Sequence, residues 1–151
     1  MSLLAPRLSI RTNPSQYWKK NLQKALKAYQ DRRPYMLGDI YSDQDDRDMS
    51  GLDLSGADLE GANLESANLS GANLTRANLF RADLTYANLT NANLTGAELD
   101  GAYLAHADLS GATLTLARLY GANLSGANLS GADIRNAGLR GAIMPDGSIH
   151  K

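Results

Sequence analysis

The chain has 151 residues, no cysteine and a formal net charge of −1. This length predicts one domain with a narrow core, and the missing cysteines exclude disulfides and thiolate metal sites. The apolar run at residues 3–5 is too short for a signal-peptide core, and no segment is apolar enough to span a membrane, so we expect a cytoplasmic protein without membrane contact.

The near-neutral total hides two segments of opposite charge. Residues 1–45 hold eight Lys and Arg against four Asp, a net of +4. Residues 46–146 hold six Arg against twelve Asp and Glu, a net of −6. An acidic segment of this kind disfavours direct binding to nucleic acid, whose phosphates are also negative.

The first predicted element is an α-helix that follows an N-terminal tail of residues 1–13. The pair Asn13-Pro14 is typical of a helix N-cap followed by proline at the first helical position. Apolar residues then recur at helical spacing over residues 14–30, and we expect the helix to end before Pro34.

Two roles are open for this predicted helix. Trp18, Leu22 and Leu26 form an apolar face that would seal the open end of the repeat array that follows, because such arrays need a terminal cap. The lysines on its other faces would instead suit a membrane surface or a partner. We favour the cap, and we interpret residues 14–47 as an α-helical cap and connector.

The rest of the chain is dominated by one strict repeat. From Leu54 to Leu139 a large aliphatic residue occupies every fifth position, leucine throughout except for Ile134. An alanine stands two residues before the aliphatic position of each unit, without interruption from Ala57 to Ala142. Such self-similarity indicates a repeat array, in which neighbouring units must stack to bury their apolar side chains.

A period of five residues fits neither of the common elements. On an α-helix the leucines would drift by about 140° per unit, and on a flat strand they would alternate between faces. A chain that bends once per unit keeps alanine and leucine inside, with Gly, Ser or Asn near the bend. The pattern therefore predicts a coil with one short wall per unit.

The units read ADLEG at residues 57–61 and ANLES at residues 62–66. They resemble the pentapeptide-repeat family, whose motif is Ala, then Asp or Asn, then Leu and two variable residues. The resemblance implies an all-β solenoid over residues 48–144, a right-handed quadrilateral β-helix of four to five coils with about twenty residues each, behind the N-terminal capping α-helix. It also implies a bacterial origin, in cyanobacteria above all, where a few members regulate cell differentiation.

The C-terminal end has no predicted element comparable to the helix. Residues 145–151 form a predicted tail that begins with the turn signal Pro145-Asp146-Gly147. An uncovered last coil would expose apolar side chains and unpaired backbone groups. Either the tail folds over this end or two chains meet there, so monomer and end-to-end homodimer are both open.

Residues twenty apart should stack in columns on the outside of the coil. Most columns hold Ser, Thr and Asn, but two adjoining walls carry aromatic residues and arginines, the composition of a protein-binding hot spot. The candidate partner-binding residues are Arg76, Phe80, Arg81, Tyr86, Tyr103, His106, Arg118, Tyr120 and Arg140. The alternative is that the aromatic rings only pack on the walls while the arginines pair with nearby acids; we favour a binding face.

No catalytic constellation, metal site or cofactor site is predicted. His106 has no nucleophile or orienting carboxylate scheduled beside it, and the aspartates lack the spacing of a calcium loop. We therefore predict a non-enzymatic, rigid scaffold that binds another protein. The alternative, implied by the resemblance, is a DNA mimic that binds gyrase or another type II topoisomerase; the modest acidic excess and the interspersed arginines disfavour it.

Overall fold

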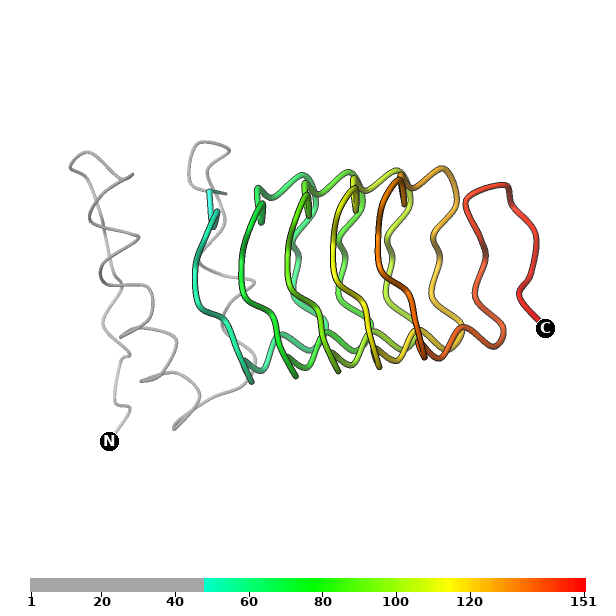
Figure 1. The fold of residues 1–151 in the computed structure, drawn as a ribbon, viewed down its shortest axis with the longest axis horizontal. Coiled ribbons are helices and arrows are strands. Elements are labelled where there is room, and N and C mark those ends of the chain that lie inside the picture. The colour runs from blue at the N-terminus through cyan, green and yellow to red at the C-terminus, as the bar shows by residue number, and fades with distance from the viewer. Residues whose placement is uncertain (1–47) are drawn as a thin grey trace, which may run out of the picture.

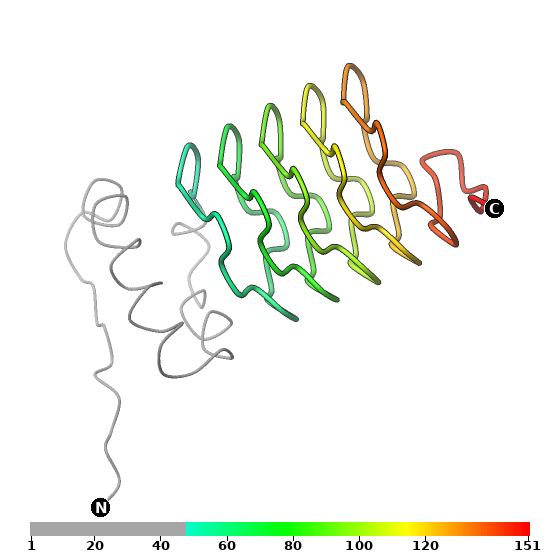
Figure 2. The same ribbon diagram turned by 60° about the horizontal axis from the view of Figure 1, so that its bottom comes forward.

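The computed structural model describes residues 48–151, which wind into the stack of coils seen in Figures 1 and 2. The predicted tail, helix and connector, including Trp18, Leu22 and Leu26, lie outside the described residues. Residues 48–151 contain no helix, and their β-structure consists of isolated single-residue bridges instead of longer strands.

Each parallel bridge joins two residues that lie twenty positions apart, from Asp48 with Asn68 to Asn123 with Ile143. Because bridges occur at every fifth residue, one coil holds four units and has four walls. We number the walls by the first bridge of each: Asp48–Asn68 is wall 1, Asp53–Asn73 is wall 2, Asp58–Asn78 is wall 3 and Asn63–Asp83 is wall 4.

The corners between walls are tight turns that require an unusual backbone conformation. The amide of Ala57 donates a hydrogen bond to the carbonyl of Leu54 at 3.0 Å, and Gly56 between them has a φ of 66°. A positive φ at this position is the signature of a type II turn, which favours glycine. The same arrangement recurs at each corner along the rod, as the period of five predicted.

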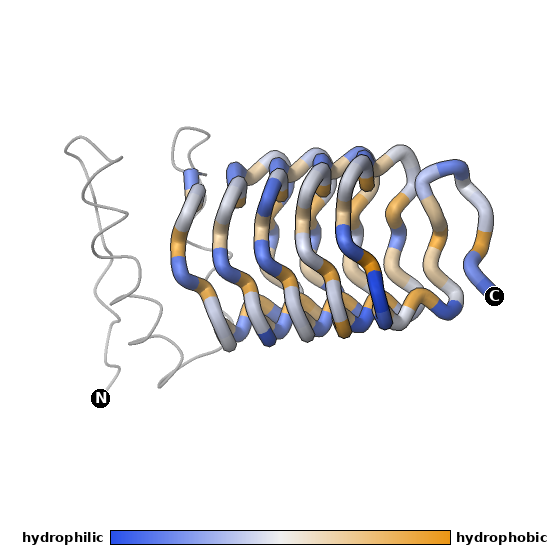
Figure 3. Tube along the Cα trace, in the orientation of Figure 1, coloured by the Kyte–Doolittle hydropathy of each residue, from blue (hydrophilic) through white to orange (hydrophobic). Residues whose placement is uncertain are grey.

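The alanines and leucines of the units fill the interior, which confirms the predicted inward positions. Leu94 is fully buried, and its amide donates to the carbonyl of Thr113 in the next coil at 2.7 Å. The amide of Asn93 donates to the carbonyl of Ala72 in the preceding coil at 2.9 Å. Figure 3 shows the apolar residues recurring at the same places in successive coils.

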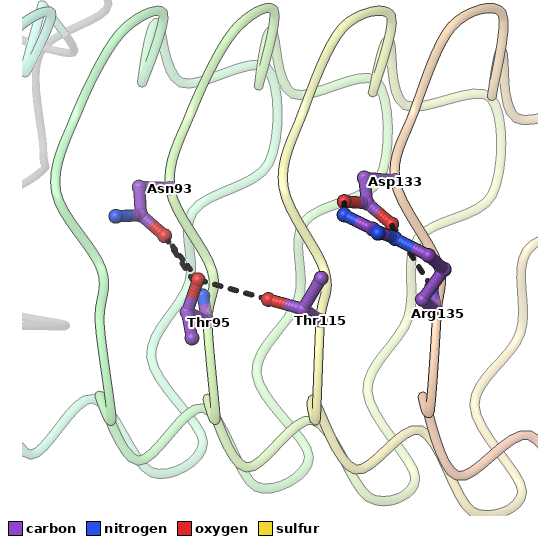
Figure 4. Close-up of polar contacts among 5 residues, drawn as sticks. All are labelled: Asn93, Thr95, Thr115, Asp133 and Arg135. Atoms are coloured by element: carbon purple, nitrogen blue, oxygen red, sulfur yellow. Dashed lines mark hydrogen bonds and ion pairs between the residues drawn. The ribbon is translucent and has the colours of Figure 1, made fainter.

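Where a unit carries Asp or Asn, this side chain bonds the turn that follows it. In Figure 4 the side-chain oxygen of Asn93 accepts hydrogen bonds from the Thr95 amide at 3.0 Å and the Thr95 hydroxyl at 2.6 Å. The Thr95 and Thr115 hydroxyls lie 3.3 Å apart in adjacent coils. Asp and Asn suit this position because their short polar side chains bond the backbone two residues on.

The C-terminal tail folds back on the last coil as a small hairpin. Ile149 forms an antiparallel bridge with Ile143, and the amide of Met144 donates to the carbonyl of Ser148 at 2.7 Å. The hairpin lengthens wall 4 and does not close the end of the rod. Ile134 occupies the same position of its unit as the core leucines, but it is 39% exposed because no further coil covers it. Leu54 in the first coil is 2% exposed.

Candidate partner-binding face

Wall 3 carries the densest group of the predicted site residues. Its columns begin at Asp58 and Glu60 and contain Phe80, Arg118, Tyr120 and Arg140. Phe80 is 36% exposed and Tyr120 is 47% exposed, whereas the corresponding positions of the described coils on walls 1 and 2 carry no aromatic residue.

The remaining predicted residues lie at corners and on the next wall. Arg76 occupies the corner between walls 2 and 3, and Arg81 the corner between walls 3 and 4. Tyr103 lies on wall 4, and Tyr86 and His106 share the corner between walls 4 and 1. The structure thus distributes the nine predicted residues over two adjoining walls and their corners.

Asp100 fixes the environment of Tyr120. Its carboxylate forms an ion pair with Arg118 at 2.6 Å and also accepts a hydrogen bond from the Tyr120 amide at 3.0 Å. The Arg118 guanidinium carbon lies 5.8 Å from the centroid of the Tyr120 ring, within the range of a cation–π contact. The exposed ring is therefore held by its neighbours before any partner arrives.

A second cation–π contact lies two coils earlier. The guanidinium carbon of Arg81 lies 5.1 Å from the centroid of the Phe80 ring. The stem of Arg81 leans over Gly101 of the next coil, because a Cβ added at Gly101 would lie 3.5 Å from Arg81 Cγ. The same relation holds for Arg76 above Gly96, so both arginines rest on a glycine corner.

Tyr86 and His106 form a stacked pair on the corner between walls 4 and 1. Their ring centroids are 5.1 Å apart and their planes differ by 11°. The His106 ring in turn covers Gly126, where an added Cβ would lie 2.5 Å from its Nδ1 atom. These contacts place His106 in an aromatic stack and do not pair it with a nucleophile.

Two residues of this surface were missed by the sequence reasoning. Leu116 is 62% exposed and occupies the corner that opens wall 3 in the coil of Arg118 and Tyr120. Gly138 lies beneath the Tyr120 ring, where an added Cβ would come within 2.6 Å of a ring carbon. A signal for Leu116 existed, because its column otherwise reads Gly, Arg, Gly and Asn.

Bulky residues with positive φ gather around walls 3 and 4. Eight non-glycine residues of the described chain have positive φ, and three of them are the small polar residues Ser66, Asn91 and Asn136. The other five, all at corners of wall 3 or wall 4, are Arg76, Arg81, Tyr86, His106 and Leu116. Because every corner of the rod needs a positive φ, these five residues carry backbone strain that the glycine corners avoid.

Relieving this strain at Leu116 should stabilise the protein. A left-handed conformation costs an L-residue about 1–2 kcal/mol. Replacing the residue by glycine removes this strain but also raises the conformational entropy of the unfolded chain, which offsets part of the stabilisation. We expect Leu116→Gly to raise the free energy of unfolding by about 0.5–1 kcal/mol in urea denaturation. Asn136→Gly, one coil further along the same corner, is the control and should change stability little, because Asn tolerates this conformation. A loss of stability in Leu116→Gly would contradict the assignment of strain.

The best-formed ion pair of the described chain lies away from this surface, on wall 2. Arg135 donates to both carboxylate oxygens of Asp133, at 2.9 Å and 2.6 Å (Figure 4). The side-chain hydrogen bond from Arg135, followed by that from its amide, lowers the pKa of Asp133 to about 2. Any stability from this pair is present above the ordinary Asp pKa of about 3.8 and is lost as the pH falls toward 2.

The described residues hold no group of three or more His, Cys, Asp or Glu side chains placed to bind a metal ion. Over residues 48–151 there is likewise no helix long and apolar enough to cross a membrane.

Several solved structures are similar to the chain. HetL, a pentapeptide repeat protein involved in heterocyst differentiation regulation in the cyanobacterium Nostoc sp. strain PCC 7120, shares 38% identity over 68% of this chain and 64% of its own, with a TM-score of 0.28. Rfr23 from the cyanobacterium Cyanothece 51142 shares 23% identity over 85% of this chain and 99% of its own, with a TM-score of 0.43.

Full-length QnrB1, a plasmid-mediated fluoroquinolone resistance protein, shares 22% identity over 63% of this chain and 66% of its own, with a TM-score of 0.31. The chain thus spans less than two thirds of HetL and of QnrB1. No curated protein sequence matches the chain.

The repeats themselves match a protein family. The family described as pentapeptide repeats matches residues 48–85, 77–115 and 114–146, with eight copies in all. These ranges cover the coils and every candidate residue of walls 3 and 4. The chain therefore belongs to the pentapeptide-repeat family, whose members fold as right-handed quadrilateral β-helices.

Proposed function

We propose that this protein is a non-enzymatic, rigid module that binds another protein through wall 3 and its adjoining corners. We call this surface the aromatic–arginine face; its residues are Arg76, Phe80, Arg81, Leu116, Arg118, Tyr120 and Arg140. The single observation that carries the proposal is the presence of two exposed aromatic rings, Phe80 and Tyr120, each in a cation–π contact with an arginine.

Binding through this face would cost little conformational freedom. Aromatic residues and Arg dominate the energetics of protein interfaces. Tyr120 is already oriented by Asp100 and Arg118, so little side-chain freedom is lost when a partner covers it. The backbone below is held by bridges between every pair of successive coils, so the face is presented without rearrangement. Tyr86, Tyr103 and His106 extend the same surface onto wall 4 and its far corner.

A protein of this kind acts by covering a surface of its partner. The proposal therefore includes regulation of the partner through this contact. The DNA-mimic alternative has one observation in its favour, the net charge of −6 over residues 46–146. Against it, the four arginines of the aromatic–arginine face interrupt the acidic surface that mimicry of DNA would require. A gyrase supercoiling assay separates the two: we expect no inhibition with micromolar protein, and clear inhibition would favour mimicry.

The proposal predicts that Phe80→Ala combined with Tyr120→Ala weakens partner binding while leaving the fold intact. Both rings are largely outside the core, so circular dichroism and the unfolding midpoint should change little. Truncating two hot-spot rings should weaken affinity for the partner about tenfold. The partner is first captured from the source cell with the unaltered protein, identified by mass spectrometry, and then titrated as purified protein.

The matched control is Thr90→Ala combined with Ser110→Ala, two stacked positions of wall 1 on the opposite side of the coil. This control should bind like the unaltered protein. If both double variants bind equally well, the aromatic–arginine face is not the binding site.

A further inference from the structure

Charges on wall 3 and its two corners change sign from coil to coil along most of the rod. Acids and arginines occupy separate coils, and the two aromatic rings lie in coils that carry arginine. In order along the rod the charged residues are Asp58 and Glu60, then Arg76 and Arg81, then Glu98 and Asp100, then Arg118, then Arg140.

Most of these charged residues form no ion pair with another described residue of the rod. Among residues 48–151 the only ion pair on this surface joins Arg118 to Asp100. Arg76, Arg81 and Arg140 form no ion pair with another described residue, and neither does Glu98. The surface of the described rod therefore retains charges without an ion pair at Arg76, Arg81, Glu98 and Arg140, and the Arg118 side chain stays 53% exposed beside Asp100.

The spacing of these layers selects the kind of partner segment. Successive coils lie about 4.8 Å apart, so the arginine layers of Phe80 and Tyr120 are separated by about 9.6 Å with an acidic layer between them. An α-helix laid along the rod presents the same face once per turn, about every 5.4 Å, so side chains two turns apart on that face are separated by about 10.8 Å. It can place one side chain on each layer over this short span.

Other extended segments fit less well. A β-strand presents one face about every 6.6–6.8 Å, which falls out of step with the layers after one residue. A polyproline II segment presents one face about every 9.3 Å, which would reach both arginine layers but leave the acidic layer uncovered. Of these three segments, the helix is the one that can place a side chain of opposite charge on both arginine layers and on the acidic layer between them.

We propose that the segment bound by the aromatic–arginine face is an α-helix of another protein that lies along the rod axis. Its acidic side chains, about seven positions apart, face the arginine layers, and a basic side chain midway faces Glu98, because Asp100 is already paired with Arg118. Apolar side chains beside them contact Phe80, Leu116 and Tyr120. This inference rests on the proposed function and specifies the chemistry of its partner.

The predicted helix at residues 14–30 of a second copy does not fit this description. The segment contains four lysines and no Asp or Glu, so it offers nothing to the arginine layers. The charge pattern thus points to a different protein and not to a self-association through this segment.

The test uses two stapled helical peptides of identical composition. One carries Glu at positions i and i+7 with Lys at i+4, flanked by leucines; the other has Lys and Glu exchanged. We expect the first to bind the full chain about tenfold more tightly than the second in a fluorescence-polarisation titration, since several exposed charge contacts each contribute modestly. Raising the salt concentration should reduce this difference.

Charge reversal on the protein provides the reciprocal arm. Arg76→Glu combined with Arg81→Glu should weaken binding of the first peptide and strengthen binding of the exchanged one. The control, Arg135→Glu combined with Lys151→Glu, changes the net charge equally but lies off wall 3, and it should leave the preference unchanged.

The helix proposal is overturned if the two peptides bind equally, if neither binds, or if a proline-rich peptide with Glu at every third position binds in their place. The proposed function fails separately, when the Phe80→Ala and Tyr120→Ala changes leave capture of the purified partner intact. Loss of capture together with no peptide preference would therefore retain the binding face and reject the helix.

Discussion

Replacing Leu94 by Ala should lower the free energy of unfolding by about 3–4 kcal/mol. Leu94 is fully buried in the middle of the rod, between Leu74 and Leu114 of the adjacent coils. The cavity left by the missing methyl groups cannot collapse easily, because the backbone on both sides is fixed by bridges at every fifth residue. Urea denaturation followed by circular dichroism measures the loss.

The same substitution at Leu129 is the matched control. Leu129 is the central leucine of a unit on wall 1 of the last coil, where it is only partly buried and has no further coil stacked on it. We expect a loss of about half that of Leu94→Ala or less, since fewer contacts disappear. Equal losses at the two positions would show that the last coil is covered in solution, contrary to the exposure of Ile134.

Gly126→Ala should destabilise the protein by about 2 kcal/mol, through two separate costs. Gly126 has a φ of 66°, which an alanine adopts only with strain. The new Cβ would also lie 2.5 Å from Nδ1 and 2.7 Å from Cε1 of His106, so the imidazole must leave its stack on Tyr86. The change is read from urea denaturation.

Gly121→Ala isolates the first of these costs. Gly121 has the same φ of 66°, but nothing lies within 4 Å of an added Cβ. It should therefore lose only about 1 kcal/mol. The additional loss of stability in Gly126→Ala should disappear when the change is made in a His106→Ala background. If the additional loss persists without the imidazole, the clash with His106 is not its cause.

The interior was predictable because one requirement is repeated in every unit. An inward leucine and alanine recur with a period of five, and only a chain that bends once per unit satisfies both, as Leu94 and its neighbours show. The bends were predictable for the same reason, and Arg76 and Arg81 have positive φ as their place in the unit implies. Ile134 follows the schedule and is still exposed, because burial also requires a further coil on top of it.

The candidate surface was predictable only in part. The stacking of residues twenty apart placed Phe80, Tyr120, Arg118 and Arg140 on one wall and Arg76 and Arg81 at its corners. It also placed Tyr86 in the same column as His106. It could not give the direction in which a corner side chain leans, which depends on space over the next coil. The contact of Tyr120 with Gly138 and the exposure of Leu116 follow from such local geometry. The predicted cap formed by Trp18, Leu22 and Leu26 stays a prediction.

The bridging of residues twenty apart also constrains how such a chain can lengthen during evolution. Duplication of a single unit between Phe80 and Tyr120 would turn everything after it by one wall, so that Tyr120 would face a quarter-turn away from Phe80. Duplication of four units would move Tyr120 one coil further along but keep it on wall 3. Genes of this family can therefore vary the length of a recognition surface in whole coils, whereas a shift of one unit divides it between two sides.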